Sequence, residues 1–219
     1  MREAFDRRVV SEVAIAVAKA CQSRAPAHLA GGTALSGAHL SHRLSRDLDM
    51  FCHEAHDVRL LARDLDAIAS ETGTEITMVR DLGTVIRARI ISGSAGEIGL
   101  DLVHEAVSDI EPAVSLEGVM VESFADLRSS KLTCILERSE PRDLVDLLFL
   151  ERAGFPPDAD IELAVRKDRG IDPGVLAWLL RQFPIEPLPQ MLVPLSVDEL
   201  HVYRDELAER FRALAISPA

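Results

Sequence analysis

The sequence predicts an α/β (α+β) protein whose first half is a mixed β-sheet flanked by helices and whose second half is helical. Two observations support this expectation. Several short apolar or alternating runs between residues 28 and 104 have the composition of strands, and glycine-containing turns separate the later ones. From Ser123 onward, apolar residues recur instead at helical spacing. We therefore expect an α/β unit over residues 1–122 and a helical region over residues 123–219.

The elements follow one another with recognisable boundaries. Glycine at position 73 is a typical helix end, and four prolines between residues 184 and 194 mark an extended linker. The second sheet turn, residues 92–96, reads as a loose loop. Helices are expected over residues 5–21, 33–43, 58–70, 124–138, 144–153, 161–165, 174–182 and 197–215. Strands are expected over 28–30, 47–51, 75–80, 84–91, 97–104 and 119–121.

Composition narrows the functional classes. The chain has 219 residues, of which 47% are hydrophobic, so it is long and apolar enough to bury a core. Its net charge of −12 argues against a protein coated in basic surface for nucleic acid, although a local basic groove remains compatible. Three scattered cysteines predict no disulfide framework or zinc site. The charged N-terminus and the lack of a long apolar run predict a cytoplasmic protein without a membrane segment.

The most informative stretch runs from residue 29 to residue 51. A short strand leads into Gly31-Gly32, where the backbone can turn tightly and a ligand can approach closely. The helix that follows from Thr33 points its free N–H groups at this turn, and phosphate is the usual ligand of such an arrangement.

The next strand carries two acids, Asp47 and Asp49, which strand alternation places on one face. Two neighbouring carboxylates repel each other unless a cation lies between them, and a hard divalent ion such as Mg²⁺ suits oxygen ligands. The glycine turn and the acid pair are each weak evidence alone, since a Gly-Gly turn is usually only a turn and an Asp-x-Asp is usually solvated. Their combination across one helix predicts a nucleotide and metal site.

Asp101 is the one acid inside an apolar strand-like run. Burying an unpaired carboxylate there is costly. One interpretation is a salt bridge to an arginine of the neighbouring strand, such as Arg87 or Arg89. The other is that Asp101 is a third acid of the metal site.

Lys131 falls on the apolar stripe of a helix. It either extends along the edge of that stripe or directs its charge at a triphosphate. Arg138 lies two turns further on the same side, and Asp146 is placed to orient Lys131. For Arg142 and Asp143 we favour a structural salt-bridge network. We expect Lys131→Met to lose activity and to keep its stability, whereas pairing with Asp146 for structure predicts a lower melting temperature.

The motif Gly31-Gly32-Thr33-Ala34-Leu35 followed by Arg43-x-Ser45-x-Asp47-x-Asp49 resembles the AbiEii/AbiGii toxin family, within the DNA-polymerase-β-like nucleotidyltransferases. The later pattern Lys131-x₆-Arg138-x₃-Arg142-Asp143-x₂-Asp146 resembles the family's second motif. The resemblance covers about residues 25 to 150. One departure is Gly32-Thr33, where the superfamily usually has Gly-Ser; threonine keeps the hydroxyl.

The resemblance implies an enzyme that moves a nucleoside monophosphate from an NTP to an acceptor and releases pyrophosphate. Asp47, Asp49 and Asp101 would hold Mg²⁺, with Mn²⁺ as an alternative. The nucleotide would be bound by Gly31, Gly32, Thr33, Arg43, Ser45, Lys131, Arg138 and Asp146, and Lys131 would join the three acids as a catalytic residue. The resemblance further implies the toxin of a toxin–antitoxin pair, with a cognate antitoxin and a tRNA 3′ end as acceptor.

Other functions stay open at this stage. The acidic net charge favours a cationic small-molecule acceptor, as in aminoglycoside or lincosamide nucleotidyltransferases, and a protein acceptor is a further alternative. A non-catalytic NTP-binding module is disfavoured by the intact set of acids and lysine. The histidine pairs His39/His42 and His53/His56 have zinc-like spacing but no evident third or fourth ligand. The sequence does not specify the nucleotide base, the acceptor or the oligomeric state.

Overall fold

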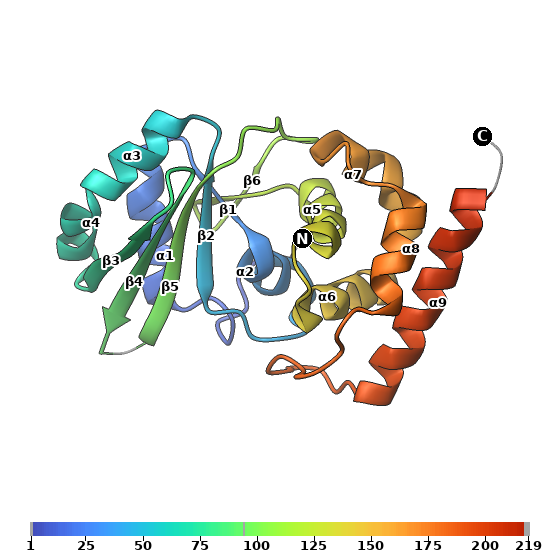
Figure 1. Ribbon diagram of the computed structural model, residues 1–219. Coiled ribbons are helices and arrows are strands. Elements are labelled where there is room, and N and C mark those ends of the chain that lie inside the picture. Colours follow the sequence, from blue (N-terminus) through green and yellow to red (C-terminus); the bar gives the residue numbers. More distant parts are fainter. Residues whose placement is uncertain (1, 94, 217–219) are drawn as a thin grey trace. The chain divides into compact units, whose positions relative to one another are not determined.

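The computed structural model describes residues 2–93 and 95–216, so part of the loop expected over residues 92–96 lies outside the described residues. The chain divides into two compact units, Met1–Ser123 and Phe124–Ala219. The first unit contains the sheet and the second contains helices only within its described residues (Figure 1). The α/β fold class expected from the sequence is confirmed.

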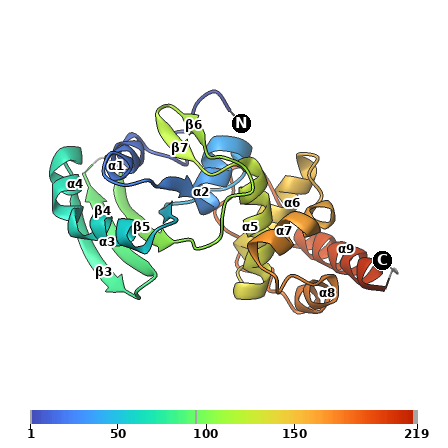
Figure 2. The same ribbon diagram turned by 90° about the horizontal axis from the view of Figure 1, so that it is seen from above.

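The first unit is built on a mixed sheet of seven strands in the order β3-β4-β5-β2-β1-β7-β6 (Figure 1). Strand β2 lies near its centre, parallel to β5 and antiparallel to β1. The β6–β7 hairpin extends the sheet on the far side of β1 (Figure 2). The strands are β1 (His28–Ala30), β2 (Asp47–Cys52), β3 (Glu75–Asp81), β4 (Val85–Ser92), β5 (Gly96–His104), β6 (Val114–Leu116) and β7 (Val119–Val121).

The two faces of this sheet differ in burial. Along β2, Leu48 and Met50 are fully buried, and Leu100 and Leu102 continue the same buried face on β5. The alternate residues of both strands are more exposed, and they include the predicted acids. One face is therefore core, and the other is available for chemistry.

The helices of the first unit are α1 (Glu12–Gln22), α2 (Gly31–Leu35), the π-helix η1 (Ser36–Leu40), α3 (Ala55–Arg63) and α4 (Leu65–Thr72). The expectation of one helix over residues 5–21 was wrong at its start, because Ser11 caps the helix by accepting a hydrogen bond from the Ala14 amide. The helix expected over 58–70 is two helices that meet at Asp64, and the one expected over 33–43 ends at Ser41 with φ 52°.

The second unit consists of α5 (Phe124–Glu137), α6 (Pro141–Arg152), the 3₁₀ turn η2 (Pro157–Asp160), α7 (Ile161–Lys167), α8 (Pro173–Arg181) and α9 (Val197–Ile216) (Figure 2). These helices match the predicted order. Buried side chains such as Leu127, Leu144, Leu176 and Phe211 form their core. Within the described residues, every helix is too short or too polar to serve as a membrane span.

Candidate active site

The predicted acids meet at the centre of the sheet in the first unit. Asp49 on β2 is the direct partner of Asp101 on β5, and Asp47 is the partner of Gly99. Partners in adjacent parallel strands direct their side chains to the same face, so all three acids lie on the less buried face of the sheet. Asp47 is exposed, whereas Asp49 and Asp101 are half-buried. The sheet register thus brings together the acids predicted from the sequence.

Two glycines leave room for these carboxylates. A Cβ atom at Gly31 would lie 1.9 Å from Oδ2 of Asp49, and one at Gly99 would lie 2.5 Å from Oδ1 of Asp47. Gly31 also has φ +66°, which favours glycine. The sequence reasoning assigned Gly31 to phosphate binding and missed Gly99. The missed signal is a glycine inside a strand, which often marks the close approach of another group.

The predicted phosphate-binding residues gather at the start of α2. A Cβ atom at Gly32 would lie 2.5 Å from Nη2 of Arg43 and 3.0 Å from Oγ of Ser45, so both polar groups border the glycine turn. Arg43 is only 2% exposed, and its Nη1 donates to the Leu44 carbonyl at 3.0 Å. Ala30, at the N-cap of α2, offers no side-chain hydrogen bond to the first helical amides. The turn therefore combines backbone donors, a guanidinium and a hydroxyl.

Thr33 has a different contact from the one expected. Its hydroxyl donates a 2.6 Å hydrogen bond to the backbone carbonyl of Asp47, and the residue is 2% exposed. This bond ties the first turn of α2 to the start of β2. In this structure the Thr33 hydroxyl donates to the backbone of the strand that carries Asp47.

Asp101 forms the cross-strand salt bridge that the sequence offered as one interpretation. Nε of Arg87 lies 3.4 Å from Oδ2 of Asp101, and the two residues are partners on β4 and β5. The Arg87 side chain is 57% exposed, so solvent weakens this attraction to about 1 kcal/mol at most. Such a contact does not prevent Asp101 from also serving a metal.

A cavity of about 170 Å³ adjoins the acid strand. Its lining includes Ser45 and Asp47, together with the arginines Arg7, Arg8 and Arg46. Its volume is below the roughly 300–1,000 Å³ of a pocket that encloses a whole ligand, so it suits one part of a larger substrate. Arg7 hydrogen-bonds to Glu117, which lowers the pKa of that carboxyl to about 2. Arginines and acids thus line this cavity together.

The predicted lysine cluster lies in the second unit, between α5 and α6. Nζ of Lys131 lies 2.7 Å from Oδ2 of Asp146 and 3.2 Å from Oδ1 of Asp143. Arg138 donates two hydrogen bonds to Asp143, from Nε to Oδ2 at 2.8 Å and from Nη2 to Oδ1 at 3.0 Å. The Lys131 side chain is 4% exposed and both carboxylates are fully buried, whereas Arg138 is 39% exposed.

The electrostatics of this cluster favour its charged form. Burial works against ionised Asp143, but the charges of Lys131 and Arg138 outweigh it and hold the pKa of Asp143 below its ordinary value. The hydrogen bond to Asp143 in turn raises the pKa of Arg138. Asp143 thus belongs to a salt-bridge network, as favoured from the sequence. Arg142 instead pairs with the nearby Glu140, at 2.6 Å.

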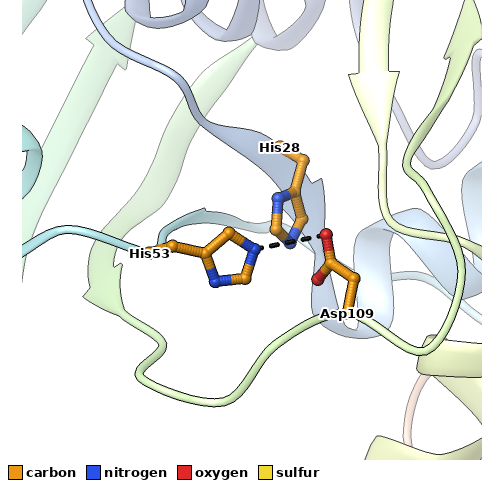
Figure 3. A group of neighbouring side chains, drawn as sticks. All are labelled: His28, His53 and Asp109. Carbon is orange, nitrogen blue, oxygen red and sulfur yellow. Dashed lines mark ion pairs between the residues drawn. The ribbon is translucent and has the colours of Figure 1, made fainter.

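The structure also brings together three potential metal ligands that sequence reasoning did not connect. In the described part of the chain, His28, His53 and Asp109 form the one group of three ligand side chains whose ligand atoms all lie within 4.8 Å of one another (Figure 3). The predicted metal ligands Asp47, Asp49 and Asp101 are not gathered that closely. The histidine group was missed because its members are far apart in the sequence, and local spacing carried no signal.

Comparison with solved structures shows the same fold in other proteins. One is a candidate nucleotidyltransferase from Helicobacter pylori, with 22% identity, 93% of each chain covered and a TM-score of 0.61. A second is JHP933 from Helicobacter pylori, with 22% identity, 94% of this chain and 91% of that chain covered, and a TM-score of 0.60. A third is MenT4, the nucleotidyltransferase toxin Rv2826c from Mycobacterium tuberculosis H37Rv, with 18% identity, coverage of 94% and 83%, and a TM-score of 0.56.

A search of curated proteins gives no match to this chain. The comparison with family models does, and its match spans residues 17–217, which include both the acid strand and the lysine cluster. With the glycine turn and the acids placed together by the fold, this match establishes that the chain belongs to the nucleotidyl transferase AbiEii toxin family of type IV toxin–antitoxin systems.

Proposed function

We propose that this toxin moves a nucleoside monophosphate from an NTP to the 3′ end of a tRNA, with Mg²⁺ held by Asp47, Asp49 and Asp101. Membership of the family supplies the nucleotidyltransferase activity, an NTP substrate and an antitoxin partner. The tRNA acceptor, the metal and the role of each residue are proposals. Mn²⁺ is the alternative ion.

The observation that carries the proposal is the packing of Gly31 against Asp49, opposite Asp101. The Gly31 backbone, a proposed phosphate donor, lies against the Asp49 carboxylate, a proposed metal ligand, and this closeness supports the proposal. A triphosphate needs both, because its charge must be neutralised while its γ and β groups are held in place. The backbone of Gly31, at φ +66°, already favours glycine, and the fit against Asp49 adds a second constraint at the same position.

The acids fit a hard divalent cation. They offer only oxygen donors, they share one face, and none is fully buried. We propose that Asp47 and Asp49 hold two ions and that Asp101 holds the one nearer the acceptor hydroxyl. When bound, such ions neutralise charge on the phosphates and make the acceptor hydroxyl a better nucleophile.

The remaining residues bind and orient the nucleotide. The amides of Gly31 and Gly32, with Arg43 and Ser45 beside them, hold the triphosphate, while Thr33 fixes the strand that bears Asp47. The acceptor oxygen then bonds to the α-phosphorus as the bond to the bridging oxygen breaks, and pyrophosphate and the hydroxyl proton leave. A low water content around such a step strengthens each of these contacts.

A further part of the proposal concerns the lysine cluster and rests on its sequence motif. Lys131 and Arg138 neutralise the leaving pyrophosphate, and Asp146 orients Lys131. The motif that carries these residues supports the assignment. The ion pairs to Asp143 and Asp146 give Lys131 a structural role as well, so its test must measure both stability and transfer.

A second candidate acceptor is a cationic small molecule such as an aminoglycoside. The net charge of −12 favours it, because an acidic protein attracts cations and repels RNA. The arginines that line the cavity beside Asp47 favour RNA locally. A tRNA acceptor predicts nucleotide-labelled tRNA as the product, and a small-molecule acceptor predicts a labelled small molecule.

The experiment is incubation of the purified chain with each labelled NTP, Mg²⁺ and total tRNA, followed by a denaturing gel and mass spectrometry of the product. A parallel reaction replaces tRNA with a panel of aminoglycosides. We expect label on tRNA for one preferred NTP and none with the Asp47→Asn/Asp49→Asn variant. Label on the small molecules alone would replace the tRNA assignment, and no label on either would contradict both acceptors.

A further inference from the structure

The strongest feature outside the proposed active site is the group formed by His28, His53 and Asp109 (Figure 3). His28 lies on β1, His53 directly follows β2, and Asp109 lies in the connection between β5 and β6. The three side chains point toward one another from these separate segments (Figure 3). From this geometry we propose a second metal site, selective for Zn²⁺ or a similar transition-metal ion, that ties the β5–β6 connection to the sheet.

The chemistry of the donors selects the metal. Two imidazole nitrogens and one carboxylate suit Zn²⁺ and other first-row transition metals, whereas Mg²⁺ prefers oxygen ligands alone. Three protein ligands with the fourth position taken by water is a known zinc arrangement. This site therefore differs in kind from the acids at Asp47 and Asp49, which offer oxygen only.

The ring of His53 is already oriented for a metal. Its Nδ1 lies 3.0 Å from the backbone carbonyl of Glu105, a contact that requires the proton on Nδ1. In the neutral ring this tautomer puts the lone pair on Nε2, the nitrogen that a cation would bind, and Nε2 faces Oδ2 of Asp109 at 3.2 Å. A carbonyl that fixes the second nitrogen is a usual feature of metal-binding histidines.

Asp109 presents a carboxylate with unmet bonding capacity. Its Oδ1 is buried and has no hydrogen-bond partner among the described residues. An ionised oxygen in that position is costly to leave unsatisfied, and a cation removes the cost. His28 supplies the third donor from a strand position that is 6% exposed, with its ring 5.6 Å from that of His53.

The backbone that carries Asp109 is held near the sheet. The Glu105 amide donates to the Cys52 carbonyl at 2.9 Å, and the Val107 amide donates to the Glu105 side chain at 3.1 Å. An ion bound by Asp109 would attach this connection to the sheet at a further point, four residues after Glu105. It would also lie on the catalytic face, because His28 precedes Ala30, the partner of Asp49, by two residues on β1, or roughly 7 Å.

The test is a titration of the full chain, first stripped with EDTA, with Zn²⁺ at neutral pH, followed by calorimetry and by melting temperature. We expect a single tight Zn²⁺ per chain, a higher melting temperature with Zn²⁺, and no displacement by excess Mg²⁺. His53→Gln and Asp109→Asn should each weaken Zn²⁺ binding by more than about tenfold. Loss of a residue that only orients a metal ligand already costs about tenfold, and these two residues would bind the metal directly. Both residues are partly exposed, so these variants should fold like wild type without metal.

The matched control is His56→Gln, which removes an exposed histidine three residues from His53 and should leave Zn²⁺ affinity unchanged. Asp47→Asn/Asp49→Asn should also keep the Zn²⁺, which separates this site from the catalytic acids. The proposal is overturned by the absence of tight Zn²⁺ binding, by equal loss in His56→Gln, or by a Zn²⁺ that disappears with the Asp47/Asp49 variant. None of these readouts depends on nucleotidyl transfer.

Discussion

Asp49 and Asp101 face each other across two parallel strands, and the missing side chain of Gly31 makes room for the Asp49 carboxylate. This relationship links the glycine turn at Gly31-Gly32 to the acid pair through direct contact. A change at either position should therefore affect both nucleotide and metal binding.

Gly31→Ala should damage the site more than backbone strain alone explains. The new Cβ would lie 1.9 Å from Oδ2 of Asp49, in addition to the cost of φ +66°. Gly73→Ala is the matched control, since Gly73 has φ +63° with no atom within 4 Å of the new Cβ. The control should lose about 1–2 kcal/mol in urea unfolding and keep transfer. Gly31→Ala should lose more stability and nearly all transfer; equal behaviour of the two variants would show that the contact with Asp49 is unimportant.

Lys131→Met should lower both stability and transfer. The sequence alone suggested retained stability, but the side chain is buried between Asp143 and Asp146. Removing one member of a buried ion cluster leaves uncompensated charge and costs about 3–5 kcal/mol.

Lys167→Met provides the comparison for this prediction. Lys167 forms a similarly buried pair with Asp126 in the same unit, at 2.6 Å, outside the family motif. The Lys167→Met variant should be less stable than wild type, while its folded molecules keep full nucleotidyl transfer. Thermal melting and transfer per folded molecule distinguish the two roles; if folded Lys131→Met also transfers normally, Lys131 is structural only.

Stability should fall in acid because of Asp143. Burial opposes its charge, but Lys131 and Arg138 hold the folded-state pKa below the unfolded value of about 3.9. A depressed carboxyl pKa contributes stability above the unfolded pKa, and this contribution is lost as pH falls through the folded pKa. The melting temperatures of wild type and Asp143→Asn should therefore differ most above about pH 4 and converge below it. A constant difference at all pH values would contradict this.

Arg46→Ala should weaken tRNA binding more than NTP binding. Arg46 is exposed and lines the cavity beside Asp47, where it can reach a phosphate of the acceptor. Loss of one phosphate contact should lower the slope of log affinity against log salt by about one. Arg63→Ala, an exposed arginine on α3, is the control and should leave the salt slope unchanged. Identical slopes for Arg46→Ala and wild type would place the RNA elsewhere.

Local patterns were sufficient to predict most of the fold. Strand β4 alternates buried and exposed residues, strand β5 alternates buried and half-buried ones, and such a period of two is visible in the sequence. The start of α1 was not predicted correctly, because Phe5, Val9 and Val10 continue its apolar spacing although the helix begins only after its cap, Ser11. Strand β6 was not predicted, and in the structure it pairs with β7.

The candidate site was predictable where its residues are close in sequence. Gly31 and Asp49 belong to one strand–turn–helix–strand segment, so their proximity follows from local geometry. The contact of Gly99 with Asp47 and the approach of Asp109 to His53 depend on the register of β5 and the path of the chain after it. Contacts between residues so far apart in the sequence depend on the folded chain, and the local periodicity of the sequence does not predict them.

The most direct test of the central claim is Mg²⁺-dependent transfer of labelled nucleotide by Asp49→Asn, compared with wild type and with Glu75→Gln. Glu75 is an exposed acid at the start of the edge strand β3, away from the cavity beside Asp47, so its variant controls for loss of a carboxylate elsewhere on the sheet. We predict that Asp49→Asn folds with equal or higher melting temperature, because like-charge repulsion is relieved, and has no detectable transfer, while Glu75→Gln transfers normally. Wild-type transfer by folded Asp49→Asn would contradict the account.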